Sequence, residues 1–150
     1  MNQFMDKSKI LDVVKSKIVE KIQKFEGLIA ETRASNNDTK SSMGDKYETS
    51  REMLQQEINN LQRQRNESLN QQTILQKITS EPSLKVQNGA LVKTDKGLFY
   101  ISASIGEIVF ENKKIMTASA ESPLVKAMTG LNKDQIFSVN NVNQTIEEIW

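Results

Sequence analysis

The sequence predicts an α+β fold, in which an antiparallel helical hairpin (a coiled coil) precedes a small antiparallel β-sheet domain with one short helix. Apolar residues recur every three or four positions through the first half, which is the period of a helical face. After residue 89 this period gives way to short β-branched and aromatic runs separated by turn residues. The expected domains are a hairpin at 1–79, a linker at 80–88 and a sheet domain at 89–150.

The first helix is expected from about Phe4 to Ala34. Six lysines between residues 7 and 24 lie mostly off its apolar face. They form either a solvated face or a basic flank that contacts an acidic groove. The apolar face consists of Leu11, Val14, Ile18, Ile22, Phe25 and Ile29.

The second helix is expected to end near Ile78, because the Ser80-Glu81-Pro82-Ser83 segment follows and proline disfavours helical geometry in the residue before it. Apolar residues of the two helices pair so that their numbers sum to 79 or 80, as antiparallel helices require. The sum places the chain reversal at Thr39 and Lys40. Each arm of about 30 residues would reach roughly 45 Å. The pairs are Phe4 with Leu75, Leu11 with Leu69, Ile18 with Leu61, Ile22 with Ile58, and Phe25 with Leu54.

The reversal falls in a polar segment, Asn36 to Glu48, whose tip is expected at about 36–46. Its Ser, Thr, Asn and Asp residues favour caps and turns over helix interiors. Ser41 or Ser42 is a candidate cap for the second helix, and Asp45 would then lie in the first turn, where the helix dipole favours an anion. The acids expected on or just behind the tip are Asp38, Asp45 and Glu48.

The C-terminal part reads as strands that flank turns, with one helix between them. That helix has Ser122 as its N-cap, Pro123 at its first position and Gly130 at its end. Two of the turns are Asp95-Lys96-Gly97 and Glu111-Asn112-Lys113-Lys114. The expected strands are Ala90 to Thr94, Leu98 to Ser102, Gly106 to Phe110, Ile115 to Ala118, Gln135 to Val139 and Gln144 to Trp150.

Composition excludes several classes of function. Up to Thr79 there are 13 Lys and Arg against 11 Asp and Glu, and after it 7 against 8, so no strongly basic half favours free DNA as a partner. The absence of Cys and His removes thiol and Ser-His catalysis and the usual zinc ligands. No apolar run approaches the length of a membrane span or a signal peptide, so we expect a cytoplasmic protein without membrane contact.

The order of these elements resembles the bacterial transcript cleavage factors GreA and GreB over nearly the whole chain. One group of matching motifs is Ser122-Pro123-Leu124-Val125-Lys126-Ala127-Met128-Thr129-Gly130, then Lys133-Asp134 and the strand Ile136 to Val139. The other is Ala30-Glu31-Thr32-Arg33, Asp38, Tyr47 and Arg51-Glu52, which resemble the family's tip and returning helix.

The resemblance implies an FKBP-like sheet domain that docks on RNA polymerase beside its secondary channel, while the hairpin enters the channel. The implied factor is no enzyme itself and holds no metal in isolation. Its tip acids Asp38, Asp45 and Glu48 would serve the magnesium of the polymerase active site, close to the RNA 3′ end, and so stimulate the polymerase's own RNA cleavage. The implied tip contacts are Lys40, Ser41, Ser42 and Lys46, and the implied docking residues are Ser122, Pro123, Lys126 and Gly130.

At the tip this sequence departs from the family. The family reads Asp-Leu-Lys-Glu there, whereas Asp38-Thr39-Lys40 continues with Ser41-Ser42, so the family's glutamate has no direct counterpart and Asp45 is the candidate substitute. Three alternatives remain open: a channel regulator that binds without cleavage, a coiled-coil interaction module unrelated to transcription, and a prolyl isomerase. The last is suggested only by the FKBP-like resemblance, and fold does not imply function.

Overall fold

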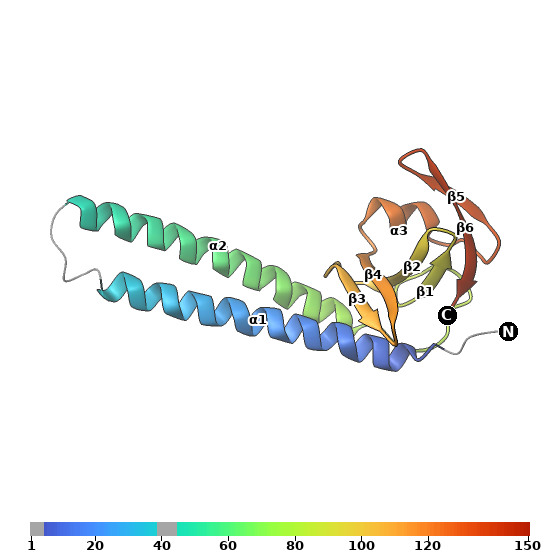
Figure 1. Cartoon of the computed structure of the whole chain (residues 1–150), viewed down its shortest axis with the longest axis horizontal. Helices are drawn as coiled ribbons and strands as arrows, with labels where there is room; N and C mark the ends of the chain where they lie inside the picture. Colours follow the sequence, from blue (N-terminus) through green and yellow to red (C-terminus); the bar gives the residue numbers. More distant parts are fainter. Residues whose placement is uncertain (1–4, 39–44) are drawn as a thin grey trace. The chain divides into compact units, whose positions relative to one another are not determined.

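The computed structural model describes residues 5–38 and 45–150, and for residues 37, 38 and 45–48 it describes the backbone alone. Two helices, α1 (Lys7–Asp38) and α2 (Asp45–Gln76), are followed by six strands and a third helix, α3 (Pro123–Met128). The predicted α+β architecture, a helical hairpin followed by a small sheet with one short helix, is confirmed (Figure 1).

Contacts divide the chain into two compact units. The first, here called the hairpin unit, is Lys17–Gln72. The second, here called the sheet unit, joins the residues up to Ser16 with Thr73–Trp150. The sheet unit thus includes the start of α1, up to Ser16, and the end of α2, from Thr73. The predicted domain boundary at residue 79 stays a prediction.

Helices α1 and α2 lie side by side in the hairpin unit (Figure 1). Their core brings Phe25, Leu28 and Ile29 of α1 against Ile58 and Leu61 of α2. The chain reversal predicted at Thr39 and Lys40 lies outside the described residues, so the pairing of the two arms by a constant sum stays a prediction. Leu69, which the sequence placed in the seam, is 37% exposed.

Helix α1 ends later than the sequence indicated, and helix α2 begins later than a cap at Ser41 or Ser42 would place it. α1 continues through Asn36, Asn37 and Asp38 instead of ending near Ala34, and α2 begins at Asp45. The predicted tip at 36–46 was therefore too long at both ends. Helix propensities differ by no more than roughly 0.7 kcal/mol for ordinary residues, so an existing helix can extend through Asn and Asp.

The sheet has the strand order β3-β4-β2-β1-β6-β5. All neighbouring strands are antiparallel except β2 and β4, which pair in parallel, with Tyr100 opposite Thr117. The prediction of a wholly antiparallel sheet was wrong at this one pairing, because the β3–β4 hairpin folds back so that β4 lies beside β2. The strands are β1 (Leu91–Thr94), β2 (Gly97–Ser102), β3 (Glu107–Phe110), β4 (Lys113–Ser119), β5 (Ile136–Val139) and β6 (Val142–Ile149).

Two turns in the sheet are tighter than expected. Glu111 and Asn112 have φ of 49° and 64°, and Asn140 and Asn141 have φ of 52° and 64°. Two successive residues with positive φ are the signature of a two-residue hairpin turn, for which Asn is among the preferred residues. The predicted four-residue turn at 111–114 is therefore half that length, and Lys113 and Lys114 belong to β4.

Both faces of the sheet are covered. On one face, Val92, Ile101 and Ala118 form a core with Val125 and Met128 of α3 (Figure 1). Leu91, Tyr100 and Ile115 alternate with them along the strands, so they point to the opposite face, where each is fully buried. On that face Lys113 Nζ lies 3.6 Å from Met5 Sδ, which places the start of the chain's described part over it.

Candidate functional site

Helix α3 forms as its sequence predicts. Ser122 has extended dihedral angles (φ −70°, ψ 148°), and its Oγ accepts a hydrogen bond from Val125 N at 3.2 Å. Pro123 occupies the start of the helix, where its missing N–H costs nothing. The cap therefore fixes the point at which the chain turns into α3, and with it the position of the proline.

The end of α3 is held by its own backbone and by the linker. Thr129 N donates to Val125 O at 2.9 Å, and Gly130 has a φ of 84°, which a glycine adopts without strain. Gly130 N donates to Val86 O at 2.8 Å, and Val86 N donates to Leu131 O at 2.9 Å. These bonds attach α3 to the segment that precedes β1.

The predicted docking residues around α3 remain accessible. Pro123 and Lys126 are exposed, and Ser122 is half-buried. Lys126 Nζ lies 3.8 Å from Glu121 Oε2, with both side chains well exposed, so this ion pair contributes little and leaves the lysine able to bind elsewhere. The structure thus brings Ser122, Pro123, Lys126 and Gly130 together on one short element.

The predicted tip residues lie at or beyond the limit of the description. The backbone places Asp38 at the last position of α1 and Asp45 at the first position of α2. Lys46 and Glu48 lie in the first turn of α2. Lys40, Ser41 and Ser42 lie outside the described residues, as do Thr39 and the predicted cap of α2.

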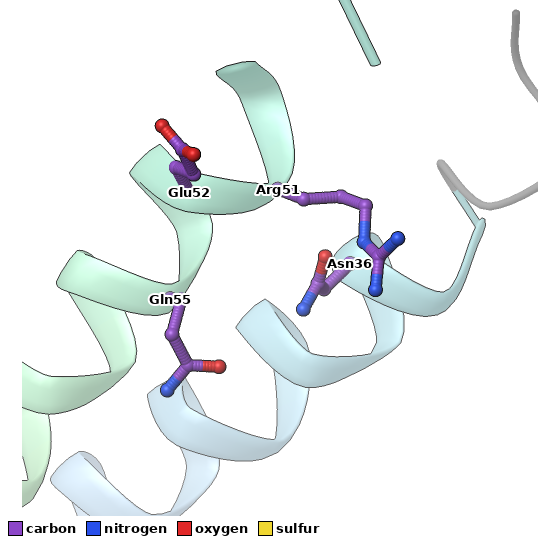
Figure 2. Close-up of a pocket in the computed structure, with 4 residues that line it drawn as sticks. All are labelled: Asn36, Arg51, Glu52 and Gln55. Atoms are coloured by element: carbon purple, nitrogen blue, oxygen red, sulfur yellow. The ribbon is translucent and has the colours of Figure 1, made fainter. Parts of the chain in front are cut away.

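A polar hollow of about 380 Å³ lies between the helices, close to these ends. It is lined by Asn36 of α1 and by Arg51, Glu52 and Gln55 of α2 (Figure 2). Arg51 extends from α2 toward α1, and its guanidinium lies beside Asn36, whereas the Glu52 carboxylate points away from α1 (Figure 2). Gln55 Nε2 donates to Asn59 Oδ1 at 3.0 Å, so its amide is partly engaged along its own helix.

The hollow presents donors of a kind that recognise oxyanions. A guanidinium offers a planar fork of N–H groups that matches carboxylate and phosphate geometry. Arg51-Glu52 belongs to the motifs that resemble the family's returning helix, whereas the sequence assigned no site role to Asn36 or Gln55. Helical spacing could have indicated Gln55, since it stands one turn beyond Arg51 on the same face of α2.

Within the described part of the chain, no three acidic side chains gather into a set that could hold a metal ion. The side chains of Asp38, Asp45 and Glu48 lie outside this described part. Among the described helices, none combines the length and apolar character needed to cross a membrane.

No family model and no curated protein sequence matches this chain. Among solved structures, the chain is similar to the crystal structure of GreA factor homolog 1 (Gfh1) of Thermus thermophilus. The two are 13% identical with a TM-score of 0.37, covering 91% of this chain and 94% of that chain. A second structure, of the transcription factor Gfh1, is 12% identical with a TM-score of 0.37 and covers 89% of each chain. The function proposed below rests on the motifs and geometry of the chain itself.

Proposed function

We propose that this chain is a Gre-like factor that binds RNA polymerase beside its secondary channel and directs the end of its hairpin toward the polymerase active site. The observation that carries the proposal is the pair of 32-residue helices whose facing ends bear Asp38 and Asp45. Helices of this length span about 48 Å each. The core that the two helices share is small, so the length of the helices, and not their packing, suggests what the hairpin does.

Asp38 and Asp45, the acids at the two helix ends, differ in whether helix stability explains their presence. Asp45 begins α2, where the positive end of the helix dipole stabilises a carboxylate. Asp38 ends α1, where the dipole disfavours an anion, and no basic residue lies in that last turn. Helix stability accounts for Asp45 but not for Asp38, so Asp38 is the stronger candidate for a functional carboxylate.

The chemistry proposed for these acids is the supply of oxygen ligands to a magnesium ion held mainly by the polymerase. Carboxylate oxygens suit magnesium, which usually keeps several waters and needs only one or two protein carboxylates. A metal ion in such a site lowers the pKa of a bound water and stabilises the attacking oxygen. Asp38 would contribute the ligand, and Asp45 its partner, while the polymerase carries out the RNA hydrolysis.

Docking is assigned to the exposed surface of α3. Pro123 offers a rigid apolar contact and Lys126 a solvent-exposed cation, and the Ser122 cap holds both in place. The arrangement suits an apolar surface of the polymerase that is bordered by acidic residues. An Arg51 guanidinium close to the hairpin end would add a contact to phosphate or carboxylate groups inside the channel.

A second candidate function is channel binding without cleavage. It is favoured by the tip sequence, in which Ser41-Ser42 follow Lys40 where the resembled family carries a glutamate. A factor with one effective tip acid would occupy the channel and alter pausing or initiation without supporting hydrolysis.

The test adds purified protein to stalled polymerase complexes that carry 3′-labelled and 5′-labelled RNA. Shortening of the RNA from its 3′ end is expected, and Asp38→Asn should reduce its rate at least tenfold while binding is retained. Glu57→Gln, an exposed change in the middle of α2, is the matched control. Binding without shortening would support the non-cleaving regulator, and absence of binding would contradict both functions.

A further inference from the structure

Strand β3 forms one edge of the sheet. It stands first in the strand order, and β4 is its one neighbour among the described strands. An edge strand presents a row of N–H and C=O groups that its own sheet does not pair, and a strand from another chain can pair with them.

The register of β3 shows which of its backbone groups are free. The two-residue turn between β3 and β4 is closed by Phe110 and Lys113, which stand opposite each other. The residues that close such a turn are hydrogen-bonded to each other, and bonded pairs alternate with non-bonded pairs along an antiparallel ladder. Phe110 and Ile108 therefore bond to β4. The N–H and C=O groups of Glu107 and Val109 point to the free edge.

Apolar side chains continue from the core of the sheet unit to this edge. Phe99 of β2 packs against that core and stands beside Met116 of β4. Val109 lies on the same face, because Glu107, two residues before it, stands opposite Met116. Exposure rises from half-buried at Phe99 to 41% at Met116 and 61% at Val109. A strand added beside β3 would cover Val109 and continue this apolar strip.

Two carboxylates flank Val109 along the chain. Glu107 stands two residues before it and Glu111 two residues after it, and both are exposed. Among the described residues, neither carboxylate has an ion-pair partner. The segment from Glu107 to Asn112 contains no lysine or arginine, and Lys114 lies on β4, one strand further from the free edge.

These charges decide between a second copy of the chain and a different partner. If β3 paired with β3 of a second copy so that the two Val109 residues met, Glu107 of each copy would stand opposite Glu111 of the other. Like charges directly opposite each other are destabilising. A pairing shifted by two residues avoids this repulsion but places no cation opposite any of the four carboxylates. Charge complementarity therefore favours a partner strand with basic residues at both positions.

We propose that the free edge of β3 binds an extended segment of another protein, with an apolar residue opposite Val109 and a Lys or Arg two residues to each side. The segment would pair antiparallel to β3 through the backbone groups of Glu107 and Val109, which is strand addition to a sheet edge. Its apolar residue would continue the strip beyond Val109, and its cations would face Glu107 and Glu111. The inference is independent of polymerase binding, since it uses neither the exposed surface of α3 nor the hairpin end.

Three capped peptides test the proposal in titrations of the isotopically labelled protein, followed by its amide resonances. The first is Thr-Lys-Thr-Val-Thr-Lys-Thr, the second has Glu in place of both Lys, and the third is the first with an N-methyl group on its valine. We expect saturable shifts for the first peptide, largest at the amides of Glu107 and Val109. Binding should be at least fivefold weaker for the other two. Absence of saturable shifts at millimolar concentration, or equal affinity for the three peptides, would overturn the proposal.

Val109→Pro removes the N–H that points to the free edge and should weaken binding of the lysine peptide at least tenfold. It should leave the fold intact, because this N–H does not bond to β4 and edge strands tolerate proline. Ser138→Pro is the matched control, since the two-residue turn after β5 leaves the Ser138 N–H on the opposite edge of the sheet. It should change binding less than twofold. Thermal unfolding checks that both variants fold, and equal affinities for the two would contradict the site.

The double variant Glu107→Gln/Glu111→Gln tests the charges and keeps the backbone unchanged. Binding of the lysine peptide should weaken about five- to tenfold, and binding of the glutamate peptide should not weaken. An unchanged affinity for the lysine peptide would overturn the choice of partner. Sedimentation of the parent protein tests the alternative occupant, because a dimer that Val109→Pro abolishes would assign this edge to a second copy instead.

Discussion

Lys7 Nζ donates a hydrogen bond to the carbonyl oxygen of Trp150 at 3.0 Å, joining residues 143 positions apart. The same ammonium donates to Glu81 O at 2.7 Å and lies 3.5 Å from Ser83 Oγ. Lys7 is 5% exposed, and burial lowers its pKa below the usual 10.5. One buried cation therefore connects the start of α1, the linker after α2 and the residue that follows the last strand.

Replacing Lys7 tests this connection. Lys7→Met should lower the free energy of unfolding by about 1–3 kcal/mol, because buried carbonyl oxygens lose a charged donor. Urea unfolding followed by circular dichroism measures the change. Lys9→Met is the control, since the Lys9 side chain is 68% exposed and its 4.0 Å pair with Asp6 is weak. Equal effects of the two variants would contradict the role given to Lys7.

Tyr100 gives a pH-dependent prediction. It is fully buried in the sheet unit, and burial raises its pKa to about 12 from 10.0. The unfolded chain loses the Tyr100 hydroxyl proton near pH 10, while the folded protein keeps it. The contribution of this group to the free energy of unfolding is therefore complete below pH 10 and is lost as the pH rises toward 12. The expected loss is up to about 3 kcal/mol. Between pH 8 and 11.5, the free energy of unfolding should fall more steeply for the parent protein than for Tyr100→Phe.

The same substitution tests the packing of Tyr100. Its Oη is buried and has no hydrogen-bond partner among the described residues. Tyr100→Phe should therefore be neutral or stabilising at pH 7, because it removes an unsatisfied polar group and keeps the ring. Tyr100→Ala should cost about 3–5 kcal/mol through the cavity it leaves. A large loss of stability in Tyr100→Phe would indicate a hydrogen bond to ordered water.

The packing of the two hairpin helices can be tested by one isoleucine change and one leucine change. Ile58 is 3% exposed and belongs to the hairpin core, so Ile58→Ala should cost about 2–3 kcal/mol. Leu69 is 37% exposed, so Leu69→Ala should cost no more than about 0.5 kcal/mol. Hydrogen exchange of the α1 and α2 amides reports the effect locally. A larger cost for Leu69→Ala than for Ile58→Ala would contradict this packing.

Substitutions at two glycines separate the cost of backbone strain from the cost of steric crowding. Gly130 and Gly89 both have positive φ, at 84° and 89°. A Cβ at Gly130 meets nothing within 4 Å, so Gly130→Ala should cost only the backbone strain, about 1–2 kcal/mol. At Gly89 the Cβ would lie 3.3 Å from Ile78 Cγ2, so Gly89→Ala should cost more. Thermal unfolding of both variants checks the order.

Much of the fold could be predicted because local chemistry determines it. Ser122, Pro123 and Gly130 each occupy the position that their capping and dihedral preferences require, and the structure confirms α3 in full. The strand runs were correct to within one or two residues at most ends, because their pattern has a period of two. The parallel β2–β4 pairing was missed because it joins strands that are not consecutive, and no local residue encodes that choice.

The hairpin shows where periodicity is insufficient. Apolar residues that recur every three or four positions stay in contact when one helix shifts by a turn against the other. Several pairings of the two helices, each with its own constant sum, therefore fit the same sequence. Leu69 satisfied the pattern but lies exposed, whereas Ile29, which had no partner in the predicted pairing, is 3% exposed in the core. The polar hollow could be predicted only in part, because Asn36 comes from α1 whereas Arg51, Glu52 and Gln55 come from α2.

Cross-linking from the hairpin end would show whether it reaches the polymerase active site. The chain has no cysteine, so Ser42→Cys creates a single site for a photoactivatable cross-linker. We expect cross-links to the RNA 3′ end and to the catalytic centre in backtracked complexes, and none from Lys85→Cys in the linker. Binding of the labelled protein with cross-links only to the outer surface of the polymerase would contradict it.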